Sequence, residues 1–333
     1  MSLYSKITGL GHYVPEWVIT NDYLSSIMDT SNEWIMERTG ITERRWVKEG
    51  DTVANMSAKA ARMALERARL TEKDVDFIIM ATISPDYFFP GSGVLLQREL
   101  GIEKAAALDI RNACSGFIYA LSIADQFIKT GHYKTILVVG AEIQSTALDL
   151  TTRGRNTAVI FGDGAGAAIV QASEQPGILS THMHADGRFA EELYVKDPGS
   201  SRPHSERQPE QILDTTTFKV VMNGQAVFKH AVVRFIEAIR EALDANQLQA
   251  SDIDLLVPHQ ANLRICQYIQ EKMKLPSEKV YTNIQRYGNT TGASIPIAMS
   301  EAWAEGKIKK NSVICLAAFG SGFTWASALM RWN

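Results

Sequence analysis

The chain has 333 residues, 45% of them hydrophobic and 21% charged, with a formal net charge of −3. This length and apolar content are more typical of two domains than of one, and the small negative charge gives no support for nucleic-acid binding. The three cysteines form no C-x-x-C pair, so neither a disulfide framework nor a zinc site is indicated. No signal peptide is recognisable and no apolar run approaches the ~20 residues of a membrane span, so we expect a cytoplasmic protein.

The predicted elements alternate between amphipathic helices and apolar strands. An alanine-rich helix over 57–70 comes first, followed by a strand. A helix over 115–130 follows Cys114, because its apolar residues recur at the spacing of one buried face and Gly131 is a natural stop. A strand over 135–142 and a glycine-broken strand pair over 158–173 complete the first half. Strands alternating with helices indicate an α/β fold whose sheets are covered by helices.

A constant offset of 178 positions relates the two halves of the chain. The matching segments are 71–86 with 249–264, and 135–142 with 313–320. At this offset Cys114 falls opposite the turn "YGNTTGAS" (287–294), and a predicted helix follows each turn. A single offset maintained over about 70 residues favours duplication over a chance likeness of two α/β units. We therefore expect two similar halves, 1–173 and 174–333.

Three chemically distinct side chains lie in turns that this duplication brings together. Cys114 is placed at the first turn of a helix, where free N–H groups and the dipole stabilise a thiolate. His259 ends an apolar strand and Asn289 lies in a glycine-containing turn. Taken singly, these would be a buried cysteine, a structural histidine and a turn asparagine. Together, a thiol, an imidazole and an amide predict an acyl-transfer site.

The chain resembles the β-ketoacyl-acyl-carrier-protein synthase III family of the thiolase superfamily over nearly its whole length. The motifs that carry the resemblance are "TSNEWIMERTGITERR" (30–45), "ACSGFIYAL" (113–121), "IFGDGAGAA" (160–168), "PHQANLRI" (258–265), "YGNTTGASIP" (287–296) and "FGSGFTW" (319–325). The resemblance implies a thiolase-like fold, in which duplicated βαβαβ halves form a layered α/β/α/β/α sandwich.

By this resemblance the chain is an acyltransferase with Cys114, His259 and Asn289 as its catalytic triad. Cys114 would take an acyl group from acyl-coenzyme A, and an enolate from malonyl-acyl carrier protein would then attack the acyl-cysteine. The N–H groups of Cys114 and Ser321 would form the oxyanion hole. This chemistry requires no metal and no redox cofactor, since coenzyme A thioester is the substrate.

The resemblance also implies binding residues and a homodimer. Those for the coenzyme A thioester are Trp34, Arg38, Arg153, Gly224, Asn262 and Phe319. Phe88 and Phe89 would close the acyl pocket, in a segment that reaches across a dimer interface in the family. Lys229, Arg234 and Arg264 are candidates for docking the acidic carrier protein. Trp34 and Arg38 are expected to hold the adenine together with Arg153.

Two departures from the family pattern leave the acyl donor and acceptor open. Ser321 replaces a glycine of a usual glycine triplet, and Arg111 and Asn112 precede the cysteine where small residues are common. A specialised enzyme of secondary metabolism, using malonyl-coenzyme A or a β-ketoacyl thioester, is therefore an alternative. A non-catalytic carrier-binding module is a second, although the intact triad argues against it. A papain-like protease, a degradative thiolase and a chalcone-synthase-like enzyme fit the motifs less well.

Overall fold

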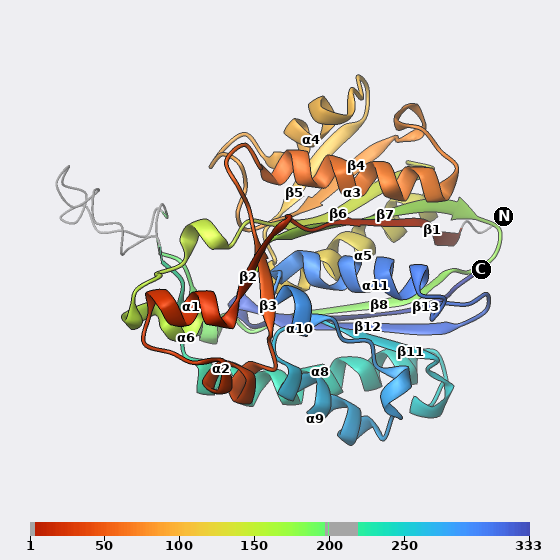
Figure 1. Ribbon diagram of the computed structural model, residues 1–333. Helices are drawn as coiled ribbons and strands as arrows, with labels where there is room; N and C mark the ends of the chain where they lie inside the picture. The colour runs from red at the N-terminus through yellow and green to blue at the C-terminus, as the bar shows by residue number, and fades with distance from the viewer. Residues whose placement is uncertain (1–3, 197–198, 200–218) are drawn as a thin grey trace.

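The computed structural model describes residues 4–196, 199 and 219–333. Helices and sheets alternate in five layers, with two helices outside each sheet and two between the sheets (Figure 1). This α/β/α/β/α sandwich is the predicted architecture. No helix of the described residues is long and apolar enough to cross a membrane.

The first sheet has five strands in the order β1-β7-β6-β4-β5. They are β1 (Tyr4–Tyr13), β7 (Gly164–Ser173), β6 (Thr135–Glu142), β4 (Phe77–Ala81) and β5 (Ala106–Ile110). β4 runs parallel to both β5 and β6, whereas β7 runs antiparallel to β1 and β6. β5 is therefore an unpaired edge, and it is partly exposed along its length.

The second sheet has four strands in the order β11-β12-β13-β8. They are β11 (Leu255–Pro258), β12 (Val313–Gly320), β13 (Thr324–Arg331) and β8 (Ile178–Ala185). Only β11 and β12 run parallel. The expected division of the chain at 173 and 174 falls between β7 and β8, the last strand of one sheet and an edge strand of the other.

Three pairs of helices supply the helical layers. α3 (Val53–Ala68) and α4 (Ser92–Leu100) cover the first sheet, and α8 (Gly224–Ala245) and α9 (Leu263–Met273) cover the second. Between the sheets lie α5 (Gly116–Lys129) and α11 (Ser294–Ala304). Every residue from 294 to 302 is buried, because α11 has protein on all sides, and apart from Ser294, Ser300 and Glu301 these residues are apolar.

The duplication is confirmed at an offset of 178 residues. β12 covers the positions of β6 shifted by 178, and β11 starts 178 residues after β4. The carboxylate of Asp76 accepts the Thr135 N–H at 3.0 Å, and that of Asp254 accepts the Val313 N–H at 2.8 Å. A residue with a left-handed backbone conformation also follows the preceding helix in each half, Arg69 (φ 58°) after α3 and Gln247 (φ 56°) after α8.

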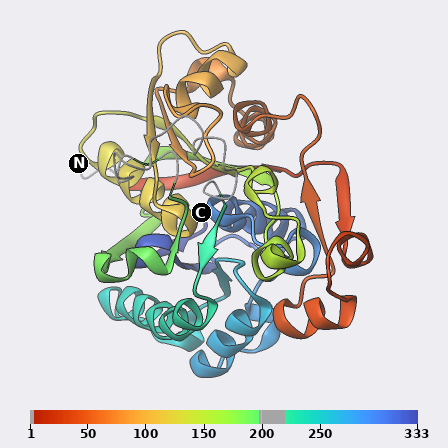
Figure 2. The same cartoon turned by 90° about the vertical axis from the view of Figure 1, so that its left-hand side faces the viewer.

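The remaining elements lie at one end and side of the sandwich (Figures 1 and 2). They are β2 (Trp17–Thr20), β3 (Glu43–Trp46), α1 (Asn21–Ile27), α2 (Asn32–Thr39), α6 (Arg155–Ala158), β9 (Leu193–Tyr194), β10 (Val221–Met222) and α10 (Ile284–Tyr287). β2 and β3 form an antiparallel ribbon, and β9 and β10 form a second, shorter one.

Two sequence predictions differ from the fold. The first helix begins at Val53, four residues before the predicted start, because Thr52 and Asn55 form a capping box there. The predicted strand pair over 158–173 is a single strand, β7, preceded by a turn at Val159 and Ile160 and an extended segment through Gly162. A Cβ at Gly162 would lie 2.2 Å from the Tyr287 carbonyl oxygen, so the chain there is shaped by close backbone approach. The predicted loop over 197–211 lies, apart from residue 199, outside the described residues.

Candidate active site

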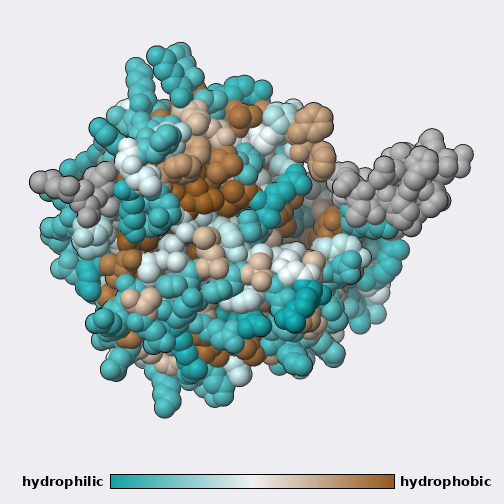
Figure 3. Space-filling view, turned by 180° about the vertical axis from the view of Figure 1, so that it is seen from behind, coloured by the Kyte–Doolittle hydropathy of each residue, from teal (hydrophilic) through white to brown (hydrophobic). Residues whose placement is uncertain are grey.

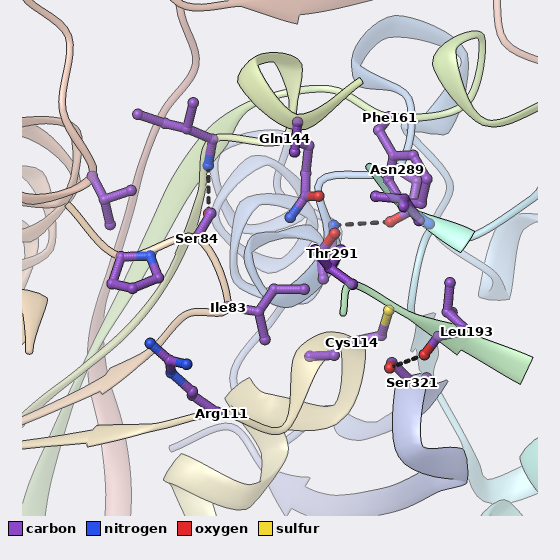
Figure 4. Close-up of a pocket in the computed structure, with 18 of the residues that line it drawn as sticks. Ile83, Ser84, Arg111, Cys114, Gln144, Phe161, Leu193, Asn289, Thr291 and Ser321 are labelled. Atoms are coloured by element: carbon purple, nitrogen blue, oxygen red, sulfur yellow. Dashed lines mark hydrogen bonds between the residues drawn. The ribbon is translucent and has the colours of Figure 1, made fainter. Parts of the chain in front are cut away.

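A cavity of about 1170 Å³ opens where strands of the two sheets end, and both halves of the chain line it. Cys114, His259 and Asn289 all lie on its wall. Cys114 follows β5, His259 follows β11, and Asn289 precedes α11. The predicted convergence of these three turns on one site is what the structure shows; Figure 4 shows Cys114 and Asn289.

Cys114 lies in a single 3₁₀ turn, Ala113–Ser115, immediately before α5. Ala113 has a φ of 45°, a strained conformation for a residue with a Cβ, and such strain is concentrated at functional sites. Thr291, its counterpart at the 178-residue offset, has a φ of 49°. A Cβ on Gly320 would lie 2.6 Å from the Cys114 Cβ and 3.0 Å from its sulfur. Glycine at 320 therefore lets the strand end approach the thiol.

Burial raises the pKa of the Cys114 thiol to about 12. The nearby Glu142 carboxylate adds to this shift, while the backbone N–H groups of Ser321 and Cys114 itself oppose it. The prediction of a helix-stabilised thiolate is therefore wrong in direction, because only 6% of the residue is exposed and desolvation outweighs the N–H groups. Cys266 and Cys315 have equally raised pKa values, but neither lines the cavity.

His259 is fully buried, and burial lowers its pKa to about 3, so the imidazole is neutral at pH 7. Its Nδ1 lies 2.6 Å from the Ser294 hydroxyl, and that oxygen also accepts the Gln260 N–H at 3.4 Å. Because Nδ1 is the one acceptor beside the Ser294 hydroxyl among the described hydrogen bonds, we assign the hydroxyl proton to the bond with Nδ1. The ring proton then sits on Nε2, which has no hydrogen-bond partner among the described residues.

The backbone around Asn289 holds its side-chain amide in one orientation. Its N–H donates to the Ile160 carbonyl at 2.8 Å, and its carbonyl accepts the Gly162 N–H at 3.1 Å. Its Oδ1 accepts the Thr291 N–H at 2.8 Å (Figure 4). This contact identifies the oxygen, so the Nδ2 group is the free end, with no acceptor recorded among the described residues. His259 and Asn289 thus each present an unused N–H donor.

A buried carboxylate, Glu142, lies at the end of β6 behind this site. It accepts the Ser84 hydroxyl at 2.6 Å, the Ile83 N–H at 3.2 Å and the Gln144 amide at 3.3 Å, and it also accepts the Gly292 N–H. Burial raises its pKa to about 7, despite these donors. At the 178-residue offset Glu142 corresponds to Gly320, and Gly292 corresponds to Cys114. Gly292 therefore has a carboxylate beside it, where Cys114 has a glycine.

Comparison with known proteins assigns the family. Residues 108–187 match the family described as 3-oxoacyl-[acyl-carrier-protein] synthase III, and residues 243–332 match its C-terminal family. β-Ketoacyl-[acyl-carrier-protein] synthase III of Methylococcus capsulatus is 45% identical over 332 residues, covering all of both chains. That of Yersinia pseudotuberculosis is 46% identical over 329 residues, covering 99% of this chain and 100% of its relative. The chain belongs to the β-ketoacyl-[acyl-carrier-protein] synthase III family.

Solved structures of the family have the same fold. The Aquifex aeolicus 3-oxoacyl-[acyl-carrier-protein] synthase III superposes with a TM-score of 0.90 at 44% identity, covering 98% of this chain and all of the other. The priming β-ketosynthase of the R1128 polyketide pathway superposes with a TM-score of 0.92 at 31% identity, covering 100% of this chain and 97% of the other.

Two arginines lie over the ring of Trp34, where the adenine is expected, and the second of them is not Arg153. Arg38 lies over the Trp34 ring at 4.4 Å, and Arg155 lies over it at 5.1 Å. Arg153 instead donates to the Asp149 carboxylate at 2.7 Å. Arg155, and not Arg153, is therefore the second arginine over the Trp34 ring, because the turn before α6 directs Arg153 toward Asp149. The contact of Arg153 with adenine is untested and stays a prediction.

The other residues expected to contact substrate line the cavity, and they differ in how tightly their neighbours hold them. Phe319 is buried against Phe323 with ring centres 5.0 Å apart. A Cβ on Gly224, the first residue of α8, would meet no atom within 4 Å, so no packing contact demands glycine there. Both polar ends of Asn262 are engaged, since it caps α9 through the Arg264 N–H and donates to the Arg38 carbonyl at 2.8 Å. Its contact with substrate stays a prediction.

Phe88 and Phe89 do not behave alike. Phe88 lines the cavity and is 59% exposed, whereas Phe89 does not line it and is 81% exposed. The ring of Phe89 projects into solvent in the single chain, so its expected part in closing an acyl pocket stays a prediction. Arg111, one of the two departures before the cysteine, lies over the Phe88 ring at 5.4 Å and also lines the cavity.

The three basic docking candidates lie near the cavity mouth. Lys229 is exposed on the second turn of α8 and Arg264 on the first turn of α9, close in sequence to Gly224 and Asn262. Arg234 is less available, because it pairs with Glu237 at 2.6 Å and packs over the Trp325 ring at 4.6 Å.

Sequence reasoning missed Ser294, Glu142 and Arg155. Ser294 lies five residues after Asn289, so the helix that follows the turn was a place to look for a partner of His259. Glu142 ends an apolar strand, where an acidic residue without an obvious role is itself a signal. Arg155 was hidden by Arg153 two positions away. Among the described residues no group of three or more His, Cys, Asp or Glu side chains forms a metal site.

Proposed function

We propose that this chain catalyses the decarboxylative condensation of an acyl-coenzyme A with a malonyl thioester on acyl carrier protein, giving a β-ketoacyl thioester. The observation that carries the proposal is the sharing of one cavity by a thiol and two unused N–H donors, from Cys114, His259 and Asn289. Full-length identity to relatives named as β-ketoacyl-[acyl-carrier-protein] synthase III supports it.

In the first step the Cys114 sulfur attacks the thioester carbonyl carbon of the acyl-coenzyme A. The carbon–sulfur bond to coenzyme A breaks, and the proton of the Cys114 thiol is taken by the departing coenzyme A thiolate. The developing oxyanion accepts hydrogen bonds from the backbone N–H groups of Cys114 and Ser321, both of which face the Cys114 sulfur. A neutral, buried thiol suits this exchange, because a proton accompanies each sulfur.

In the second step the malonyl carboxylate leaves as carbon dioxide, and its bonding electrons form an enolate. The enolate oxygen accepts the Nε2–H of His259 and the Nδ2–H of Asn289. The enolate carbon attacks the acyl-cysteine carbonyl, the bond to Cys114 breaks, and the released thiolate takes one proton from solvent. His259 acts as an electrophile here, since burial keeps its pKa near 3 and its free nitrogen carries a proton.

The binding surfaces divide between the two substrates. Trp34, Arg38 and Arg155 hold the adenine of coenzyme A, because two guanidinium groups lie over one indole ring. Lys229 and Arg264 receive the acidic carrier protein at the mouth of the cavity, with Arg234 as a secondary contact. Neither step needs a redox cofactor, because thioester exchange and decarboxylation transfer no electrons to or from an external group. Neither needs a metal, because N–H donors stabilise the oxyanion and the enolate.

A homodimer, and a cytoplasmic location, complete the proposal. β5 offers an unpaired strand edge, and Leu108 at its centre is 37% exposed. Apolar surface gathers on the upper part of the face seen in Figure 3. A second copy of the chain paired at β5 would cover this edge and receive the exposed Phe89.

A specialised condensing enzyme is the second candidate. The observation that favours it is Arg111, a cation on the cavity wall beside Phe88, at a position where a fatty acyl chain gains nothing from charge. The likeness to the priming β-ketosynthase of a polyketide pathway supports the same candidate.

A panel of acyl-coenzyme A donors with malonyl-carrier protein or malonyl-coenzyme A tests the function. We expect one β-ketoacyl product per productive donor, with the mass of donor acyl group plus acetyl-carrier less one hydrogen, and preference for the carrier-bound malonyl group. Turnover only with malonyl-coenzyme A would favour the specialised enzyme. Absence of both an acyl adduct and a product across the panel would refute the condensation.

A further inference from the structure

Ser321 faces three different segments with its three polar groups. Its backbone N–H is directed at the Cys114 sulfur. Its carbonyl accepts the Thr324 hydroxyl at 3.2 Å, and that hydroxyl is 2.7 Å from the Ser115 hydroxyl, next to the nucleophile. Its own hydroxyl donates to the Leu193 carbonyl (Figure 4).

The backbone of this loop accepts a side chain at 321 but not at its neighbours. Gly320 is extended and leaves no room for a Cβ beside Cys114. The left-handed conformation falls on Gly322 (φ 72°) and Phe323 (φ 42°), and Ser321 does not adopt it. The serine therefore causes no backbone strain, and its hydroxyl is bound to Leu193 instead of projecting freely into the cavity.

Leu193 belongs to a short two-stranded ribbon on the wall of the cavity. β9 and β10 pair over only two residues each, Leu193 with Met222 and Tyr194 with Val221. A two-stranded ribbon of this length is marginal by itself, so it depends on contacts with the body of the protein. Leu193, Tyr194 and Met222 all line the cavity. The Ser321 hydroxyl thus joins this wall to the residue that faces the nucleophile.

We propose that Ser321 is a positioning and specificity-determining residue, whose hydroxyl fixes the β9–β10 ribbon as the cavity wall over Cys114. The same hydrogen bond restrains the peptide that carries the Ser321 N–H. The fixed wall limits the width available to the first carbons of an acyl group, so linear acyl thioesters are favoured over those branched next to the carbonyl. This inference rests on the proposed function and adds the substrate class that the site selects.

The first test measures the ribbon without reference to activity. Hydrogen–deuterium exchange is compared for the wild type, Ser321→Ala and Ser321→Gly, in peptides covering 190–195 and 220–224. Both variants lose the hydroxyl, so both should exchange at least about fivefold faster there, the effect of one hydrogen bond. Thr130→Val is the matched control, since the Thr130 hydroxyl also donates to a carbonyl, that of Gln126 at 3.0 Å, at the far end of α5. It should leave the ribbon unchanged.

The second test measures acylation of Cys114 by linear and branched acyl-coenzyme A of equal carbon number, in single turnovers followed by intact mass. In Ser321→Ala and Ser321→Gly the linear-to-branched rate ratio should fall roughly fivefold, mainly through faster branched acylation, because the released wall no longer limits the width of the cavity. A change in Ser321→Gly alone would assign the effect to the Cβ and overturn the proposal. Unchanged ribbon exchange in both variants would also overturn it. Failure of the wild type to accept any acyl group would refute the proposed function. The hydrogen–deuterium exchange of the ribbon would still show whether the Ser321 hydroxyl anchors it.

Discussion

Burial keeps both Cys114 and His259 uncharged at neutral pH. It raises the pKa of the thiol to about 12 and lowers that of the imidazole to about 3. The proposed mechanism therefore uses neutral donors and a neutral nucleophile around one cavity. Glu142, whose pKa is raised to about 7, is the group behind the site that changes charge near neutrality.

The charge of Glu142 should control the reactivity of Cys114. Below the pKa of the Cys114 thiol, its thiolate fraction rises tenfold per pH unit. Labelling of Cys114 by iodoacetamide should therefore rise steeply from pH 7 to 9. Glu142→Gln removes the adjacent negative charge and should speed labelling by about threefold or more at pH 8, with a smaller effect at pH 6. Peptide mass spectrometry measures it, with Cys266 and Cys315 as unlabelled internal controls. Equal rates in both proteins at pH 8 would contradict this role.

Protonation of His259 should destabilise the fold in acid. The unfolded histidine binds a proton below pH 6.5, whereas the folded one does so only near pH 3, so the unfolded state binds more protons between these values. Stability therefore falls as pH drops through this window, by about 2 kcal/mol at pH 5 relative to pH 7. His259→Gln should lose this part of the slope, measured as the free energy of unfolding in urea at each pH. An identical slope in wild type and variant would show that His259 is not held neutral.

Short elements at the edge of the sandwich form the proposed coenzyme A site. The Ser31 side chain accepts the Trp34 N–H and starts α2, which places Trp34 and Arg38 one turn apart. Arg155 is the first residue of α6, and its guanidinium also donates to the Asp29 carbonyl at 2.6 Å, which holds it near Trp34.

Arg155→Ala should raise the KM for acyl-coenzyme A roughly three- to tenfold, because one cation–π contact with the adenine site is lost. Arg153→Ala is the matched control and should change KM less than about twofold, since Arg153 is paired with Asp149 at the surface. An acyl-pantetheine, which lacks adenine, should be used equally by both variants. A larger effect from Arg153→Ala than from Arg155→Ala would restore the original assignment.

Periodicity predicted the elements, because buried strands and helix faces leave regular patterns, and the family resemblance predicted their layers. The 178-residue offset predicted that the turns holding Cys114, His259 and Asn289 lie together. The sign of the Cys114 pKa shift could not be predicted, since it depends on how tightly Gly320 and the second half enclose the sulfur. The choice of Arg155 over Arg153 depends on a turn geometry that two nearby arginines do not reveal. Likewise, the bond from Ser321 to Leu193 joins residues 128 positions apart.

At the scale of the whole molecule, the duplicated halves meet around the cavity while one edge of the first sheet stays open. β5 lies on the side opposite the β2–β3 ribbon (Figures 1 and 2). An open edge with exposed apolar side chains favours pairing with another strand, and a second copy of β5 supplies one.

Leu108→Lys should therefore convert a homodimer to a monomer, because a charge at the centre of β5 cannot be buried unpaired in the interface. Leu150→Lys is the matched control, since both leucines are 37% exposed and Leu150 lies away from β5. Sedimentation velocity measures the change, and only Leu108→Lys should sediment as a 36.8 kDa species. A monomeric wild type, or a dimer that tolerates Leu108→Lys, would remove β5 as the interface.

The most direct test of the account follows the acyl group on Cys114 through one turnover by intact mass. The wild type should gain one acyl adduct on Cys114 from acyl-coenzyme A and lose it when malonyl-carrier protein is added, with release of carbon dioxide. His259→Ala and Asn289→Ala should gain the same adduct but discharge it ~10²–10³-fold more slowly, because each lacks one enolate donor. An adduct on Cys114→Ala, or variants at His259 and Asn289 that decarboxylate malonyl thioester normally and fail at acylation, would contradict the account.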